Sequence, residues 1–203
     1  MSTERRSWAG TDLEQRQRAR REKLLAAGVD LLGAADGPAV SVRAVCRAAG
    51  VTERYFYESF GDREEFVRAV YADVGERAHL TLVGAVDSAA TPRDRATAGV
   101  LAFVELMVDH PEMGRVLMLA PITEPALGGR GLALAPTFVV LVQDQLDAVR
   151  DPAQRQLVAV GLVGALTSLF IGYLDGTIAP DRERFVAHCV DLLIGANRPV
   201  RRA

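Results

Sequence analysis

Residues Ser41–Phe66, SVRAVCRAAGVTERYFYESFGDREEF, contain two short helical patterns joined by a tight corner at Gly50 and Val51. Ser41 and Thr52 stand where the two helices would begin, because a side-chain hydroxyl can accept a hydrogen bond from a free N–H of the first turn. Gly50 suits the end of the first helix, since glycine tolerates the left-handed backbone of a C-cap. Two short helices around such a corner can present one rigid helix to the major groove of DNA. The stretch therefore predicts a helix-turn-helix.

The rest of the chain is also predicted to be helical. Apolar residues recur at helical spacing, and no segment shows the alternation of a strand. Start and stop signals predict an all-α fold of about nine helices. We expect them near residues 11–32, 42–49, 52–60, 62–80, 93–108, a short segment after Pro111, 134–149, 152–173 and 181–194. The predicted organisation is a flexible arm (1–11), a helix-turn-helix domain (12–75) and a larger helical domain (76–203).

Composition excludes several classes of protein. A hydrophobic content of 49% and a charged content of 25% are those of a globular chain with a buried core. The 24 Lys+Arg and 26 Asp+Glu give a formal charge of −2, which argues against a histone-like or coat protein. Cys46 and Cys189 lack metal-ligand spacing, so we expect buried thiols, no metal and no cofactor.

The sequence also predicts a cytoplasmic protein with no membrane partner. The first ten residues, MSTERRSWAG, lack the apolar segment of a signal peptide. The most apolar run, Leu157–Leu174, contains glycines and the polar pair Thr167 and Ser168, so it is not expected to span a membrane.

The spacing of residues across three consecutive helices resembles the DNA-binding domain of the TetR family of bacterial transcriptional regulators. The resemblance covers about residues 12–75, and the segment RREKLLAAGVDLLG is similar to the family's first helix. The matching pattern is Val45-Cys46-x-x-Ala49-Gly50-Val51-Thr52, followed by Phe56-Tyr57-x-x-Phe60-x-x-Arg63-Glu64-x-Phe66. Beyond this domain the chain matches only in helical character and length.

The resemblance implies that DNA contacts come from the second and third helices and from the start of the fourth. Tyr57 matches a tyrosine whose hydroxyl reaches the DNA backbone, and Arg63 takes the place of a phosphate-binding lysine. Ser41 and Thr52 can hold phosphates with their hydroxyls and with free N–H groups. The expected DNA-binding residues are Ser41, Arg43, Thr52, Arg54, Tyr55, Tyr57 and Arg63.

Arg54 departs from the family pattern, in which glycine is common at this position. An arginine here can bond the O6 and N7 edge of guanine, while Tyr55 packs on a thymine methyl group or a sugar. The alternative is that Arg54 touches only phosphate. Arg16 and Arg20 are weaker candidates, for a contact with the DNA backbone or the minor groove.

A dimer and a ligand pocket are two further implications of the resemblance. We expect a homodimer through the last two long helices, Pro152–Tyr173 and Asp181–Ile194, binding a palindromic double-stranded operator. In the first of these, small residues at 161, 164, 165 and 168 permit close approach, and Leu162, Leu166, Leu169 and Phe170 supply apolar area. A small, apolar effector is expected to contact Phe103, Met107, Met113, Met118, Phe138, Gln143, Thr167 and Tyr173. Each of these residues can also be ordinary core.

The predicted function is a DNA-binding transcriptional regulator, in its commoner form a repressor, whose operator affinity changes when the effector binds. One alternative is a DNA-binding dimer that needs no ligand. Another is an α-helical enzyme, which the motifs disfavour. The three histidines, His79, His110 and His188, are scattered, with no metal-binding pair and no nucleophile near a base.

Overall fold

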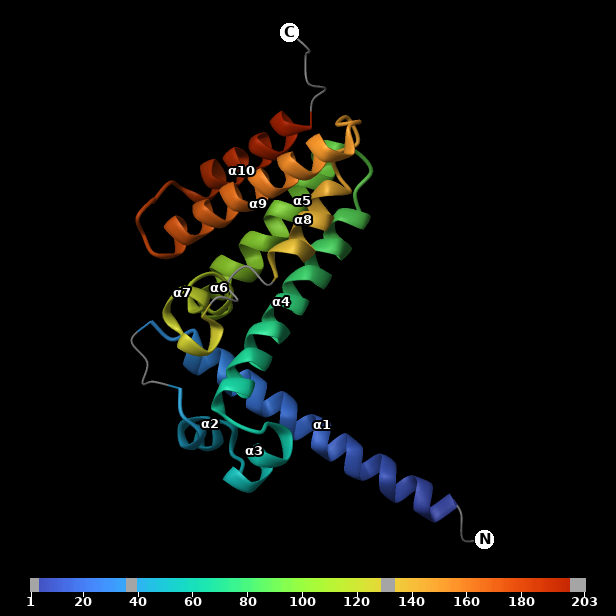
Figure 1. Cartoon of the computed structure of the whole chain (residues 1–203), viewed down its shortest axis with the longest axis vertical. Coiled ribbons are helices and arrows are strands. Elements are labelled where there is room, and N and C mark those ends of the chain that lie inside the picture. Colours follow the sequence, from blue (N-terminus) through green and yellow to red (C-terminus); the bar gives the residue numbers. More distant parts are fainter. Residues whose placement is uncertain (1–3, 36–39, 129–133, 198–203) are drawn as a thin grey trace.

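The computed structural model describes residues 4–35, 40–128 and 134–197, and in these ranges the chain forms helices without any strand (Figure 1). The all-α prediction is confirmed, with ten α-helices where about nine were expected, because one additional turn forms at residues 120–123. Short π- and 3₁₀-helical segments, η1 (Glu105–Asp109) and η2 (Pro125–Leu127), complete the chain. The α-helices are α1 (Glu4–Leu32), α2 (Val42–Ala49), α3 (Glu53–Ser59), α4 (Arg63–Asp87), α5 (Pro92–Val104), α6 (Pro111–Met118), α7 (Ala120–Thr123), α8 (Ala135–Gln143), α9 (Pro152–Leu174) and α10 (Arg182–Ala196).

Helices α1 to α3 and the first turns of α4 form the helix-turn-helix domain. Ser41 caps α2, with its hydroxyl oxygen accepting a hydrogen bond from the N–H of Ala44 at 3.3 Å. Gly50 ends α2 with φ +65°, the left-handed conformation that glycine adopts without strain. Asp62 caps α4 in the same way, accepting from the N–H of Glu65 at 2.6 Å. The helix start predicted at Ser41 is confirmed with its capping hydrogen bond, whereas Thr52 stands at the predicted start of α3 but its side chain makes no capping hydrogen bond.

Three phenylalanines fix the angle between α3 and α4. Phe56 and Phe60 lie four residues apart and face Phe66 of α4; all three are almost fully buried. Their ring centroids are 5.0 to 5.6 Å apart, within the range in which aromatic pairs attract one another. The guanidinium of Arg21, from α1, covers the ring of Phe60 at 4.4 Å from its centroid. This cluster holds α3 rigidly against α1 and α4.

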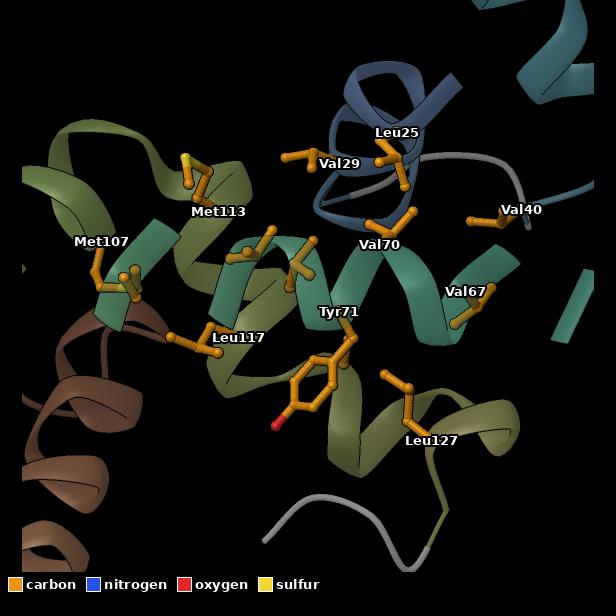
Figure 2. Packing of buried hydrophobic residues seen from close by; sticks show 14 of the residues in the cluster. Leu25, Val29, Val40, Val67, Val70, Tyr71, Met107, Met113, Leu117 and Leu127 are labelled. Atoms are coloured by element: carbon orange, nitrogen blue, oxygen red, sulfur yellow. The ribbon is translucent and has the colours of Figure 1, made fainter. Parts of the chain in front are cut away.

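Helix α4 continues without a break from the helix-turn-helix domain into the larger domain. Near its start, Val67 and Val70 pack beneath Leu25 and Val29 of α1, and Leu127 packs below them (Figure 2). Farther along, α4 packs against α5 and α8, while α9 and α10 form the outer pair of the larger domain (Figure 1). One continuous hydrophobic cluster therefore connects the two domains through α4.

Several boundaries differ from the sequence-based expectations. Helix α1 begins at Glu4, so residues 4–11, expected to be an arm, are helical, because they contain no proline that would stop the helix; residues 1–3 of that arm lie outside the described ranges. The expected division at residues 75 and 76 falls inside α4. Helix α8 ends at Gln143 and not near 149, since Asp144 begins a run of turns.

The most apolar helix is α9, in the run that the sequence does not predict to span a membrane. By length and composition α9 is long and apolar enough to cross one. The glycines and Thr167 of α9 do not lower its mean hydropathy below that of a membrane-spanning helix, because leucines and valines surround them. Length and composition alone are weak grounds for a membrane span, and one face of α9 packs on α6, α8 and α10.

The expected burial of both cysteines is confirmed. Cys46 and Cys189 are buried free thiols. Burial raises the pKa of Cys189 to about 11, and burial together with the nearby Glu53 carboxylate raises the pKa of Cys46. Both thiols therefore stay protonated near neutral pH and act as small apolar side chains.

A charge pair joins the start of α4 to the larger domain. Arg63 donates from Nη1 and Nη2 to the two carboxylate oxygens of Glu124 at 3.0 and 2.7 Å, and from Nε to the Val40 carbonyl at 2.6 Å. The Glu124 side chain is only 10% exposed, so water screens this pair less than a surface pair. The hydrogen bonds from Arg63 lower the pKa of Glu124 below its ordinary value of 4.5.

Removing the central ring of the aromatic cluster should destabilise the protein. We expect Phe56→Ala to lower the free energy of unfolding by about 3–5 kcal/mol, since it leaves a cavity between Phe60 and Phe66. Urea denaturation measures this change. Tyr57→Ala is the matched control. Tyr57 is the next residue in the sequence and is 56% exposed, so the loss of its ring should cost less than about 1 kcal/mol. Equal losses in the two variants would contradict the role given to the cluster.

Neutralising the Glu124 carboxylate should lower stability in a pH-dependent way. We expect Glu124→Gln to lose about 1–3 kcal/mol near pH 7. Because the pKa of Glu124 is lowered by folding, the stability that it contributes is present above its unfolded pKa and is lost as the pH falls through its folded pKa. The difference between the two proteins should therefore shrink below about pH 4.5. Denaturation midpoints measured from pH 3 to 7 check this.

The exposed pair between Arg93 and Asp191 provides the control. Asp191→Asn should change the free energy of unfolding by less than about 1 kcal/mol, since both partners are well hydrated. A pH-independent loss in Glu124→Gln would mean that the carboxylate charge is not what stabilises this contact.

Candidate nucleic-acid interface and ligand cavity

Helix α3 presents most of its polar side chains to solvent. Its inner face is occupied by Phe56, and its outer residues at 53, 54, 55, 57 and 58 are exposed. The Thr52 side chain makes no capping hydrogen bond, so its hydroxyl is available to another acceptor or donor. The Ser41 hydroxyl oxygen accepts from α2, while its proton remains available as a donor. Both predicted phosphate-binding hydroxyls are thus at exposed helix starts.

Two of the predicted DNA-binding arginines pair with carboxylates on the same surface. The side chain of Arg54 is 84% exposed and its Nε donates to Glu58 at 3.0 Å. Arg43 lies 3.5 Å from Glu53. Exposed pairs of this kind contribute little free energy, so a phosphate or a guanine edge can replace the carboxylate at small cost.

The two tyrosines differ in their surroundings. The guanidinium of Arg20, on α1, lies 4.3 Å from the centroid of the Tyr55 ring, so Tyr55 is held against α1. Tyr57 is more exposed, and its ring makes an edge-to-face contact with Phe56. Arg20, a weaker candidate for a DNA contact from the sequence, therefore packs on Tyr55 within the domain.

Arg63 differs from the other predicted DNA-contact residues because its hydrogen bonds are already filled within the protein. All three of its guanidinium nitrogens already donate to Glu124 or to the Val40 carbonyl. A phosphate would have to replace the bidentate contact with Glu124. The sequence could not predict this pairing, because Glu124 is 61 residues away from Arg63 along the chain.

A largely apolar cavity lies in the larger domain between α4, α5, α8, α9 and α10. The cavity has a volume of about 160 Å³, enough for on the order of ten water molecules. Near the ends of the helices its lining includes Arg95, Gln145 and Asn197, and the remaining wall is apolar apart from Thr167. The shape and lining are those of a site for a small organic molecule.

Half of the ligand-binding residues predicted from the sequence line this cavity. Phe103, Met118, Phe138 and Thr167 do so. The other four lie elsewhere. Met107, in η1, and Met113, in α6, are core residues. Tyr173 stacks on Phe185 at 4.4 Å, and Gln143 is not part of the wall. The sequence interpretation missed Leu82, Val86 and Arg95, because helical periodicity does not reveal which neighbour a helix face will meet.

The outer face of α9 is apolar and uncovered. Leu157 and Val160 are 68% and 53% exposed, and side chains placed at Gly161 or Gly164 would meet no atom of the subunit. In contrast, Leu162 and Phe170, predicted to supply apolar area to a dimer, are buried inside the subunit, and Leu166 lines the cavity. The helical period places residues 157, 160, 161, 164 and 168 on the outer face instead.

Comparisons with known proteins agree with this architecture. The family described as "Bacterial regulatory proteins, tetR family" matches residues 24–70. A comparison with curated proteins gives no match.

Solved regulators share the fold along most of their length. A TetR-like transcriptional regulator from Rhodococcus sp. RHA1 is 21% identical with a TM-score of 0.64, covering 88% of this chain and 93% of that one. The fatty acid degradation regulator FadR from Bacillus halodurans is 14% identical with a TM-score of 0.72 (87% and 95% covered). A TetR-family regulator from Streptomyces coelicolor is 19% identical with a TM-score of 0.67 (88% and 81% covered).

The family match falls on α1 to α4, the same helices that carry the capped helix-turn-helix and its exposed polar surface. Proteins of this family regulate transcription by binding DNA and are not enzymes. Residues 24–70 therefore form a helix-turn-helix domain of the kind described for the tetR family of bacterial regulatory proteins.

Proposed function

We propose that this protein is a cytoplasmic, dimeric repressor whose operator affinity falls when a small molecule enters the cavity of the larger domain. The observation that carries the proposal is the continuity of α4. Its first turn follows the Asp62 cap beside α3, and its last turns supply Leu82 and Val86 to the cavity wall. A ligand that moves these two residues would tilt a helix whose other end holds α3.

DNA recognition is assigned to the exposed residues of α2 and α3. Ser41, Thr52 and Tyr57 would hold phosphates, and Arg43 would assist them. Arg54 would read a guanine edge, with Tyr55 against a neighbouring base or sugar. Arg63 would join them only by exchanging Glu124 for a phosphate. Together these contacts cover one half-site, so two subunits are needed for a palindromic operator.

The outer face of α9, with α10 beside it, is the proposed dimer interface. Leu157 and Val160 offer apolar area, and the open glycines at 161 and 164 permit a partner helix to approach closely. Pairing this face with its copy would remove an exposed apolar stripe from water.

Selection of bound sequences from a random DNA pool tests the assigned function. We expect an inverted repeat whose half-sites lie about 10 base pairs, or a multiple of that, apart from centre to centre. A pool that yields no preferred sequence would contradict operator binding.

The role of Arg54 can be separated from that of a phosphate contact. We expect Arg54→Ala to relax the preference at one base pair of each half-site, with a loss of about 1–3 kcal/mol on the selected operator. Arg43→Ala is the control and should weaken binding evenly across sequences. If Arg54→Ala also weakens binding evenly, Arg54 contacts only the DNA backbone.

Filling the groove between the glycines of α9 should weaken the dimer. We expect Gly164→Leu to raise the dimer dissociation constant at least about tenfold, because the new side chain meets a partner helix but no atom of its own subunit. Gly84→Leu is the matched control, since Gly84 is also an open helical glycine, on α4. Sedimentation equilibrium measures both. Identical dissociation constants for the two variants would place the interface elsewhere.

A further inference from the structure

The cavity has one cationic group in an otherwise uncharged wall. Of the described residues that line it, Arg95 alone carries a charge. Arg95 lies in the first turns of α5, and Gln145 and Asn197, from the ends of α8 and α10, share the wall with it. The aromatic rings of Phe103, Phe138 and Phe170 supply much of the apolar surface. The cavity therefore combines an apolar body with a single positive group.

The hydrogen-bonding capacity of Arg95 is not filled within the subunit. Its Nη2 donates to Asp147 at 3.2 Å, and its Nε is buried without a hydrogen-bond partner. A buried donor without an acceptor is unfavourable, so another acceptor would stabilise this side chain. The Asp147 side chain is 68% exposed, which makes the existing pair weak and easily exchanged.

The neighbouring amides do not offer the same attraction. The Asn197 side chain donates to the Gln145 carbonyl at 3.1 Å and accepts from the N–H of Ala148 at 3.0 Å, so it already holds the turns after α8. Arg95 remains the group with unused donors and a permanent charge. A planar carboxylate matches the fork of its N–H groups.

We propose that the effector is an organic acid, with an apolar body of about ten non-hydrogen atoms and one carboxylate bound by Arg95. The body packs among the phenylalanines, and the carboxylate takes the acceptor position that Arg95 lacks. This inference rests on the proposed function, because it names the class of molecule that the regulatory cavity accepts. It adds an anionic group to the small, apolar effector expected from the sequence.

Two probes with the same eight-carbon body, octanoate and 1-octanol, test the charge requirement. Isothermal titration of the full chain without DNA should show octanoate binding at least roughly tenfold more tightly than 1-octanol, because a charge-assisted contact replaces an unfilled donor. Arg95→Gln should abolish this preference and leave 1-octanol binding unchanged, which also shows that the cavity is intact.

Arg93→Gln is the matched control, two residues away on the same helix. Arg93 is exposed, pairs with Asp191 and does not line this cavity, so its variant should keep the preference for octanoate. Equal binding of the two probes, absence of binding by either, or the same loss in both arginine variants would overturn the inference. Acid that binds through Arg95 without changing operator affinity would leave the inference standing and contradict the proposed regulation instead.

Discussion

The rest of the structure depends on the burial of α4 along its length. Phe66, Val67 and Val70 anchor its first turns in the core of the helix-turn-helix domain, while Val86 near its other end is buried beside the cavity. Since interiors are closely packed, a rigid helix held at both ends cannot shift at one end without a response at the other. The aromatic cluster around Phe56 extends this constraint to α3. The exposed polar surface of α3 and the cavity are thus parts of one mechanical unit.

Arg63 adds a second constraint at the same place. It ties the first turn of α4 to Glu124, in the segment between α7 and η2. A guanidinium that holds this carboxylate with both Nη groups cannot hold a phosphate in the same way. The contact with Glu124 and a contact with DNA are therefore alternatives. The free energy lost when Arg63 leaves Glu124 would be subtracted from the free energy gained on binding a phosphate.

Local signals made the helix-turn-helix predictable from the sequence. Ser41 and Gly50 act through a hydrogen bond and a backbone conformation within a few residues, and the structure has them as expected. The faces of the larger domain were less predictable. Leu157 and Leu162 are chemically identical, yet one is exposed and the other buried, because their environments depend on packing between α9, α8 and α10. Arg95 was overlooked for the same reason, since its place in the cavity wall results from α8 and α10 meeting α5.

Helix α9 connects the two proposed activities of the larger domain. Its inner face supplies Val163, Leu166 and Phe170 to the cavity wall. Its outer face, about two residues (half a helical turn) out of phase, carries Leu157 and Val160. A ligand and a partner subunit would therefore press on opposite sides of one helix. Any shift of α9 that accommodated a ligand would change the surface offered to a partner, and with it the separation of the two α3 helices. In the proposed regulation the effector would thus act on operator spacing by two routes, through α4 within a subunit and through α9 between subunits.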